Sequence, residues 1–289
     1  MKDASIVIPH YRDVDRLRRC LEALARSTEA ALSRAEVVVV DNTSGVDLSW
    51  VEQDYPFARL VTESEQGAAC ARNRGVHETT APRIAFLDSD CVPRGDWLTR
   101  VLDVALADEG EVKGGEITTF DETPPPRSGA EAFEAVFAFD QRSYVEDKGF
   151  TVTANMVFER ALFERVGELT NGLSEDVEWC RRAVAKGAVI TYDPGLSVSH
   201  PTRGDWPSLR KKWLRTTREG YGTELANRGA WIRKALLMPL SAVAHGPRVL
   251  LSPRLNGPGE RLRGLFTLFR LRLVRGWWML VLAWGGNPR

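Results

Sequence analysis

Apolar runs of strand length alternate with segments of helical period over the first 90 residues. The strands are predicted at residues 5–8, 37–40, 58–62 and 83–87, and the helices between them at residues 15–24 and 68–76. The second of these strands is four consecutive valines, and such a continuous run is typical of a strand covered on both faces. The alternation predicts an α/β fold, a Rossmann-like, mostly parallel sheet flanked by helices.

Shorter elements follow in the second half of the chain. Helices are predicted at residues 97–107, 161–166 and 175–185, and strands at residues 112–120, 151–158 and 189–192. Gly187 fits the position after a helix end, and Pro124, Pro125 and Pro126 indicate a surface loop. From Trp206 onward the pattern is helical, basic and rich in tryptophan.

The charge distribution divides the chain in two, although its net charge is zero. Residues 203–289 hold 17 Lys and Arg against 4 Asp and Glu, which leaves 39 − 17 = 22 basic and 39 − 4 = 35 acidic residues before them. We therefore expect an acidic globular domain at residues 1–202 and a basic helical extension at residues 203–289, with the extension suited to an anionic surface.

Cysteine usage and hydropathy indicate a cytoplasmic protein. Four widely separated cysteines show no metal-ligand spacing and no disulfide pattern. The N-terminus enters an apolar strand at once, which leaves no room for a signal peptide. The apolar stretches at residues 235–251 and 277–284 are interrupted or too short to span a bilayer. Peripheral attachment to the inner face of the membrane stays open.

Asp88 and Asp90 follow the predicted strand at residues 83–87 directly. Side chains two residues apart on a strand point the same way, so both carboxylates can face one hard cation. A cation held by few protein ligands keeps positions open for water and a diphosphate. Solvated loop charges are the alternative explanation for such a triplet, because acidic residues are frequent in this chain.

Six segments in order resemble family 2 glycosyltransferases of the GT-A fold. They are the opening strand at residues 5–11, the loop at 39–44, the GxxxARNxG segment Gly67–Gly75, the D-x-D strand at 86–90, an acceptor-side segment at Asn155 and 163–167, and the "ED" motif at 174–176. The resemblance covers roughly residues 4 to 202 and implies a nucleotide diphospho-sugar as donor. Glu65 stands where the family often has asparagine.

For the donor, the resemblance implies that Asp41 accepts a hydrogen bond from the pyrimidine N3–H, with Pro9 and Tyr11 near the base. Arg72 is implied to contact the nucleotide or its phosphates. As alternatives, Asp41 could be a turn residue after a strand and Arg72 a surface charge on a helix. The form Asp41-Asn42-x-Ser resembles members that transfer rhamnosyl and galactofuranosyl groups.

For the chemistry, the resemblance implies that Asp90 coordinates Mg²⁺ or Mn²⁺ and that Asp88 contacts the ribose or the metal's water. His200 matches a family position that approaches the metal, although a lone histidine is more often structural. Asp176 is implied as the general base and Glu175 as a residue that orients it or the acceptor. Both acidic residues could also serve only to start a helix.

The resemblance thus implies an inverting hexosyltransferase that uses a UDP- or dTDP-sugar and extends a cell-envelope saccharide or a lipid-linked acceptor. A non-catalytic nucleotide-sugar-binding or membrane scaffold protein of the same fold is the alternative. The basic extension fits either an amphipathic segment on an anionic membrane or a helical subdomain that packs on the catalytic domain. Nucleic acid is not expected as a partner.

Overall fold

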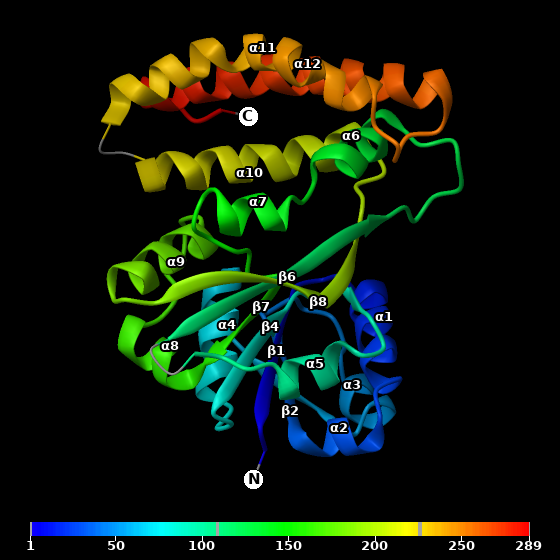
Figure 1. Ribbon diagram of the computed structural model, residues 1–289, viewed down its shortest axis with the longest axis vertical. Helices are drawn as coiled ribbons and strands as arrows, with labels where there is room; N and C mark the ends of the chain where they lie inside the picture. Colours follow the sequence, from blue (N-terminus) through cyan, green and yellow to red (C-terminus); the bar gives the residue numbers. More distant parts are fainter. Residues whose placement is uncertain (1, 108–109, 225–226, 289) are drawn as a thin grey trace. The chain divides into compact units, whose positions relative to one another are not determined.

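The computed structural model describes residues 2–107, 110–224 and 227–288 and divides into two compact units (Figure 1). Unit 1 comprises Met1–Thr118 and Asp140–His200, and unit 2 comprises Thr119–Phe139 and Pro201–Arg289. The segment Thr119–Phe139 therefore groups with the C-terminal residues, although the charge pattern placed it in the first domain.

An eight-stranded sheet with the order β3-β2-β1-β4-β7-β6-β8-β5 forms the centre of unit 1. Its strands are β1 (Ala4–His10), β2 (Ala35–Asp41), β3 (Ala58–Thr62), β4 (Arg83–Leu87), β5 (Val92–Pro93), β6 (Glu111–Phe120), β7 (Asn155–Glu159) and β8 (Val189–Pro201). β1 pairs in parallel with β2 and β4, and β2 pairs in parallel with β3. β7 is antiparallel to both β4 and β6. The mostly parallel α/β sheet is confirmed, with an antiparallel extension after β4.

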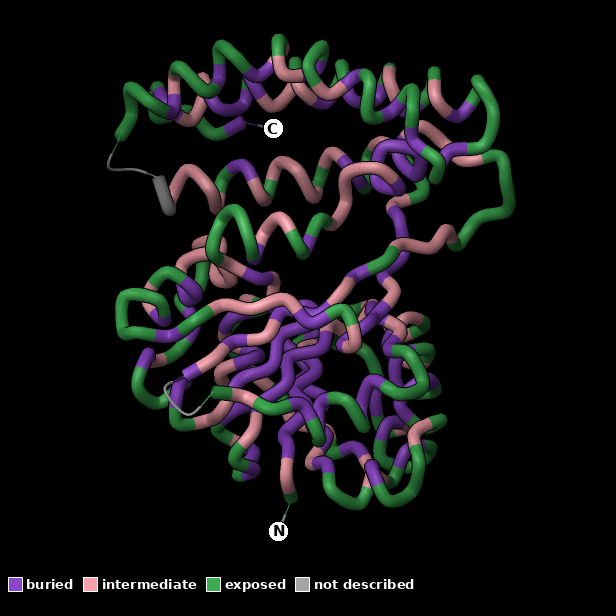
Figure 2. Tube along the Cα trace, viewed as in Figure 1, coloured by how far each residue is buried: buried purple, intermediate pink, exposed green. Residues whose placement is uncertain are grey.

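Helices surround this sheet in unit 1. They are α1 (Val14–Ala25), α2 (Glu29–Arg34), α3 (Trp50–Asp54), α4 (Ala68–His77), α5 (Trp97–Asp103), α7 (Gln141–Glu146), α8 (Arg160–Val166) and α9 (Glu175–Ala185). The valine strand of β2 is buried along residues 37–40, as its continuous apolar run predicts. Figure 2 shows the buried residues concentrated in the central strands.

The predicted bounds are confirmed for β3, β4 and α9, but several other elements differ. β8 continues through Pro194 to Pro201, because its later residues pair with β5 at the sheet edge. α5 ends at Asp103, where Val104 turns to an extended conformation. The strand predicted at residues 151–158 begins only at Asn155. The short elements α2, α3, α7 and β5 and a helix at Gly129–Phe137 were not predicted, because runs of nine residues or fewer carry little periodicity.

Contacts among three aromatic side chains hold α9 against the sheet, with Phe86 and Phe158 edge to face and Trp179 tilted against Phe158. The ring of Phe158 in β7 lies 5.3 Å from that of Phe86 in β4 and 4.9 Å from that of Trp179 in α9. Trp179 is fully buried, and its Nε1 donates a hydrogen bond to the Gly167 carbonyl over 2.8 Å. The aromatic contacts therefore hold the helix whose first turn carries Glu175 and Asp176.

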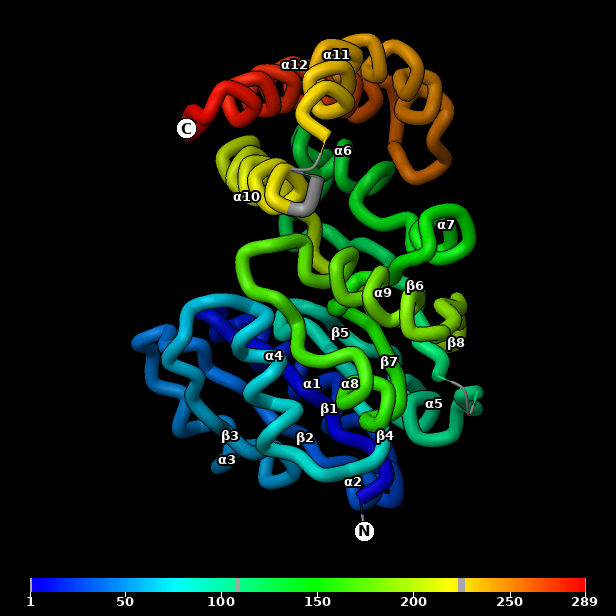
Figure 3. Tube along the Cα trace, turned by 90° about the vertical axis from the view of Figure 1, so that its left-hand side faces the viewer, coloured from blue at the N-terminus to red at the C-terminus, as the bar shows by residue number. Residues whose placement is uncertain are grey.

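Unit 2 is helical and has its own core. It contains α6 (Gly129–Phe137), α10 (Trp206–Glu224), α11 (Arg228–Leu250) and α12 (Gly257–Ala283). α11 and α12 run side by side (Figures 1 and 3), and α12 also packs on α6. The buried carboxylate of Glu134 is bound by Arg203 at 3.1 Å and by Lys212 at 2.8 Å. Among the described residues, we find no helix with both the length and the apolar content to cross a bilayer.

Candidate active site

The polar residues that follow β1, β2 and β4 meet at one edge of the sheet. In the parallel register His10 at the end of β1 stands opposite Asp41 at the end of β2. The neighbouring strand β4 ends at Leu87, so that Asp88 and Asp90 follow at the same edge. This is the edge at which open parallel sheets bind ligands.

Asp41 is held by His10, a residue that the sequence analysis did not assign to the site. His10 Nδ1 lies 3.2 Å from Asp41 Oδ1, and the Ser44 amide donates to Asp41 Oδ2 over 3.2 Å. The His10 side chain is fully buried, and its Nε2 has no hydrogen-bond partner within the part of the chain that the structure describes. The signal for His10 is its place in the register, because it ends β1 as Asp41 ends β2.

The loop around Asp41 is cross-linked and strained. Asn42 donates from Nδ2 to the carbonyls of Glu63 and Glu65, at 3.2 and 2.6 Å, and accepts the Gly67 amide at 2.7 Å. Arg12 and Thr43 adopt left-handed backbone angles, with φ of 62° and 53°. Such conformations in non-glycine residues cost free energy and cluster at ligand sites.

Pro9 and Tyr11 flank this loop at the end of β1. Pro9 is partly buried, whereas the Tyr11 side chain is 47% exposed. The guanidinium of Arg12 lies over the Tyr11 ring at 5.0 Å. An exposed aromatic ring beside Asp41 offers a planar surface on which a nucleobase could stack.

Arg72 connects the D-x-D segment with the "ED" motif. Its side chain is only 4% exposed, its Nη2 contacts Asp88 Oδ1, and its Nη1 lies 3.0 Å from Glu175 Oε1. Burial alone would lower the pKa of Arg72, but the charges of Asp88 and Glu175 outweigh burial and raise the pKa. The alternative that Arg72 is a surface charge on a helix is therefore wrong.

The other residues of the GxxxARNxG segment position α4 and hence Arg72. A Cβ on Gly75 would lie 2.3 Å from Val7 Cγ1, so only glycine lets the helix approach β1 this closely. Asn73 exchanges two hydrogen bonds with the backbone of Leu169, at 2.9 and 3.0 Å. Gly67 begins the helix with a φ of 147°, which L side chains rarely adopt. The segment thus joins α4 to the sheet and to the chain that leads into α9.

Asp176 lies in the first turn of α9, directly after Glu175. Burial raises the pKa of Asp176 to about 6, and the negative charge of Glu175 acts in the same direction. The Val177 amide donates to Asp176 Oδ1 over 2.8 Å, which opposes the shift together with Arg72. Ser174 is the N-cap residue, so the two acidic residues lie inside the helix. A pKa near 6 suits a carboxylate that accepts a proton near neutral pH.

Asp90 pairs with His200, whereas Asp88 turns to Arg72. His200 Nε2 lies 3.1 Å from Asp90 Oδ2, which brings a carboxylate and an imidazole together. Oxygen and nitrogen donors of this kind suit Mn²⁺, and the carboxylate suits Mg²⁺. Across residues 2–107, 110–224 and 227–288, no group of three or more His, Cys, Asp or Glu side chains could hold a metal. The side chains fit a cation that takes its remaining ligands from water and substrate.

Asn155 serves a structural role, although the resemblance places it on the acceptor side. It is fully buried and accepts a hydrogen bond from Trp97 Nε1 over 3.0 Å. Its Nδ2 donates to the carbonyls of Glu116 and Leu196, at 3.0 and 2.8 Å. The side chain therefore joins neighbouring strands inside the sheet.

Comparison with known proteins identifies relatives over most of the chain. The family model described as "Glycosyl transferase family 2" matches residues 5–167. "Glycosyltransferase AglE" of Haloferax volcanii is 28% identical over 218 residues, which cover 72% of this chain and 70% of the relative. "Succinoglycan biosynthesis protein ExoM" of Rhizobium meliloti is 25% identical, with coverage of 80% and 78%. "Pre-mycofactocin glycosyltransferase" of Mycobacterium tuberculosis is 27% identical, but only 44% of it is covered.

Solved structures support the fold. The "Mannosyltransferase PcManGT from Pyrobaculum calidifontis in complex with GDP-Man and Mn2+" aligns with a TM-score of 0.57 and 14% identity, covering 98% of this chain and 75% of that one. S. aureus TarS 1-349 aligns with a TM-score of 0.53 and 15% identity, covering 94% and 90%. The GT-A fold expected from the sequence is confirmed at this level.

Proposed function

Because this chain belongs to glycosyl transferase family 2, we propose that it is an inverting hexosyltransferase that moves a sugar from a UDP- or dTDP-sugar to a hydroxyl of a saccharide or glycolipid. The observation that carries this proposal is the Asp88–Arg72–Glu175 link. It supports a site in which the donor's diphosphate and the attacking hydroxyl lie within reach of one arginine.

In this proposal the donor's pyrimidine lies beside Asp41, Pro9 and Tyr11. Asp41 accepts the N3–H of the base, and His10 keeps the carboxylate oriented through its 3.2 Å contact. The exposed ring of Tyr11 covers one side of the base. Arg72 contributes positive charge toward the diphosphate.

Asp90 and His200 would hold a divalent cation, Mg²⁺ or Mn²⁺. The structural neighbour PcManGT was solved with Mn²⁺, which supports a divalent cation in an enzyme of this fold. Such an ion, when bound, offsets the negative charge of the departing diphosphate. Asp88 would be left with its other carboxylate oxygen for the ribose or a metal-bound water, because Arg72 already binds its Oδ1.

Asp176 acts as the general base, and Glu175 orients it together with Arg72. The Asp176 carboxylate takes the proton of the acceptor hydroxyl while the hydroxyl oxygen forms its bond to C1 of the sugar. The bond from C1 to the diphosphate oxygen breaks on the opposite face, and its electron pair leaves with the nucleoside diphosphate. One displacement of this kind inverts the anomeric configuration.

The acceptor is proposed to be a cell-envelope saccharide or a lipid-linked sugar at the cytoplasmic face of the membrane. ExoM is named for succinoglycan biosynthesis, which supports a polysaccharide pathway. The basic residues of the extension, 17 Lys and Arg against 4 Asp and Glu, support a location near anionic lipid.

A panel of UDP- and dTDP-sugars with Mn²⁺ tests the proposal. Slow hydrolysis of a preferred donor, measured by nucleoside diphosphate release, should identify the nucleotide and the sugar. With an acceptor found by screening, nuclear magnetic resonance of the product should show inversion at C1. Retention would exclude the single displacement. Donor binding without hydrolysis or transfer by any sugar would favour the non-catalytic binding protein.

A further inference from the structure

Large apolar side chains form an exposed stripe along α12. Its members recur every three or four residues and so share one side of the helix; they are Leu262, Phe266, Phe269, Leu273 and Trp277. Phe266 and Trp277 are 68% and 66% exposed. Leu268 and Leu271, on the opposite side of α12, are buried in the core of unit 2. The side chains of the stripe therefore take no part in the core of unit 2, which α12 contacts with its opposite side.

A second exposed stripe lies on α11, which packs alongside α12. It consists of Leu236, Leu237, Leu240, Val243 and Leu250, followed by Leu251 just after the helix. Figure 2 shows exposed positions recurring along both helices. We call the two stripes together the apolar face. Soluble monomers rarely expose so many large apolar side chains in one region.

The charges around the apolar face are almost all positive. Residues 227–288 contain ten Lys and Arg but a single acidic residue, Glu260. Glu260 is 2% exposed and lies 3.3 Å from Arg127, so it adds no negative charge to the surface. Arg233 and Arg248 on α11 are both exposed. A second copy of the same face would bring like charges together, whereas an anionic surface would complement them.

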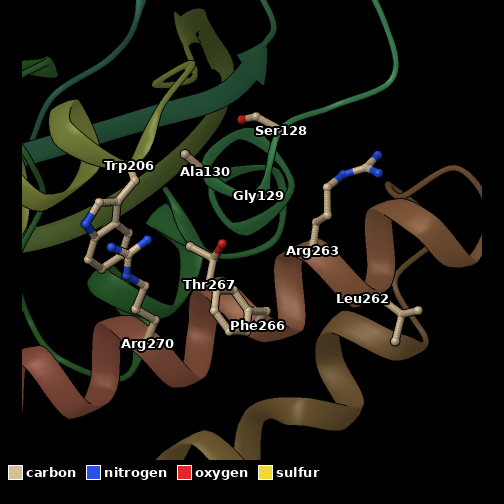
Figure 4. Close-up of a pocket in the computed structure, with 9 residues that line it drawn as sticks. All are labelled: Ser128, Gly129, Ala130, Trp206, Leu262, Arg263, Phe266, Thr267 and Arg270. Carbon is tan, nitrogen blue, oxygen red and sulfur yellow. The ribbon is translucent and has the colours of Figure 1, made fainter.

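A cavity of about 420 Å³ lies beside the apolar face, between α6 and α12 (Figure 4). Leu262 and Phe266 of the stripe line it. At its other side the guanidinium of Arg270 stacks on the Trp206 ring at 3.9 Å. Apolar walls next to a guanidinium match the acyl chain and phosphate of an anionic lipid.

We propose that the apolar face docks unit 2 onto a bilayer that contains anionic lipid. α11 and α12 lie in the interface with their stripes in the acyl boundary, and the arginines contact the headgroups. Trp284, which is 66% exposed and lies just after α12, sits at the level of the headgroups as amphipathic aromatic residues do. The binding concerns unit 2 alone and does not depend on the reaction proposed for unit 1.

Flotation of the full-length protein with phosphatidylcholine vesicles, with and without phosphatidylglycerol, tests this proposal. The wild-type protein should float with the anionic vesicles, and L240D/F266D should lose at least tenfold in bound fraction. The matched control V184D/V189D places the same two charges at exposed valines of unit 1 and should float like the wild type. Equal flotation of L240D/F266D and the wild type would overturn the proposal.

The arginines are tested by R233Q/R248Q, which should weaken binding to anionic vesicles severalfold and reduce its sensitivity to salt. R26Q/R94Q removes two exposed arginines from unit 1 and should leave binding unchanged. Sedimentation equilibrium tests whether the apolar face instead binds a second copy of the chain. A wild-type dimer that L240D/F266D dissociates, without vesicle binding, would assign the apolar face to a second copy of the chain and refute the lipid proposal.

Discussion

Arg72 Nη1 lies 3.0 Å from Glu175 Oε1 across 103 residues of sequence. The same guanidinium contacts Asp88, so one buried cation orients a carboxylate from each side of the proposed reaction. The two Nη atoms of the guanidinium reach the two carboxylates in different directions. A lysine ammonium is a single point charge and could not hold both carboxylates in these positions.

The substitution Arg72→Lys should therefore lower kcat/KM by about 10²-fold although it keeps the charge. Arg74→Lys is the matched control, because Arg74 lies on the same helix, is exposed and pairs with Glu78 one turn away. Steady-state kinetics of both variants checks the expectation. A loss equal in the two variants would show that the Arg72 link does not position the reacting groups.

The raised pKa of Asp176 should appear in the stability of the protein. Because the folded pKa of about 6 exceeds the ordinary 3.8, the folded state binds more protons between these values and stability falls as pH rises through that window. Asp176→Asn removes this penalty and should raise the free energy of unfolding at pH 7 by about 1–3 kcal/mol. Below about pH 4 the two proteins should be equally stable. Urea unfolding at both pH values measures the difference.

The same pKa should set the acidic limb of activity. The base must be ionised to accept a proton, so kcat should rise with pH and level off above about 6. Asp176→Asn should lose at least about 10³-fold in kcat and retain donor affinity, because the donor contacts lie elsewhere. Near-normal turnover by this variant would remove Asp176 as the base.

The effect of Mn²⁺ on donor binding should depend on the Asp90 carboxylate. Asp90→Ala should weaken donor binding at least about tenfold in the presence of Mn²⁺, and added Mn²⁺ should no longer improve it. Asp15→Ala, which removes an exposed carboxylate from α1, should bind as the wild type does. Calorimetry of donor binding with and without chelator compares them, and an unchanged affinity of Asp90→Ala would exclude the residue as a metal ligand.

Two helical glycines offer a matched test of packing. Gly75→Ala places its Cβ 2.3 Å from Val7 Cγ1 and should destabilise unit 1 by about 1–3 kcal/mol. Gly220→Ala meets no atom within 4 Å in α10 and should stabilise the protein by about 0.5–1 kcal/mol. Thermal unfolding of the two variants should therefore shift in opposite directions.

The alternation of strands and helices along the first 90 residues and the family motifs were readable from the sequence, because each depends on local pattern. The valine run of β2 and the bounds of β3 and β4 needed only hydrophobic periodicity and a following polar residue. Asp41, Asp88 and Asp90 could be placed at one edge because parallel strands end there.

The partners of these residues could not be read in the same way. The contact of Arg72 with Glu175 depends on tertiary packing over 103 residues, and no local pattern encodes it. His10 lay inside a recognised segment, but only the register of β1 against β2 shows that it supports Asp41. The extended β8 and the short α6 and α7 likewise depend on neighbours distant in sequence.

The two hydrogen bonds between the Asn73 side chain and the Leu169 backbone, together called the clasp, have a consequence for biosynthesis. A nascent chain that ends at Asp88, just after β4, contains α4 but lacks Leu169, and with it the clasp. It also lacks Glu175, the second carboxylate that Arg72 contacts. The contacts that hold α4 and Arg72 in place are therefore complete only once the residues up to α9 have been synthesised.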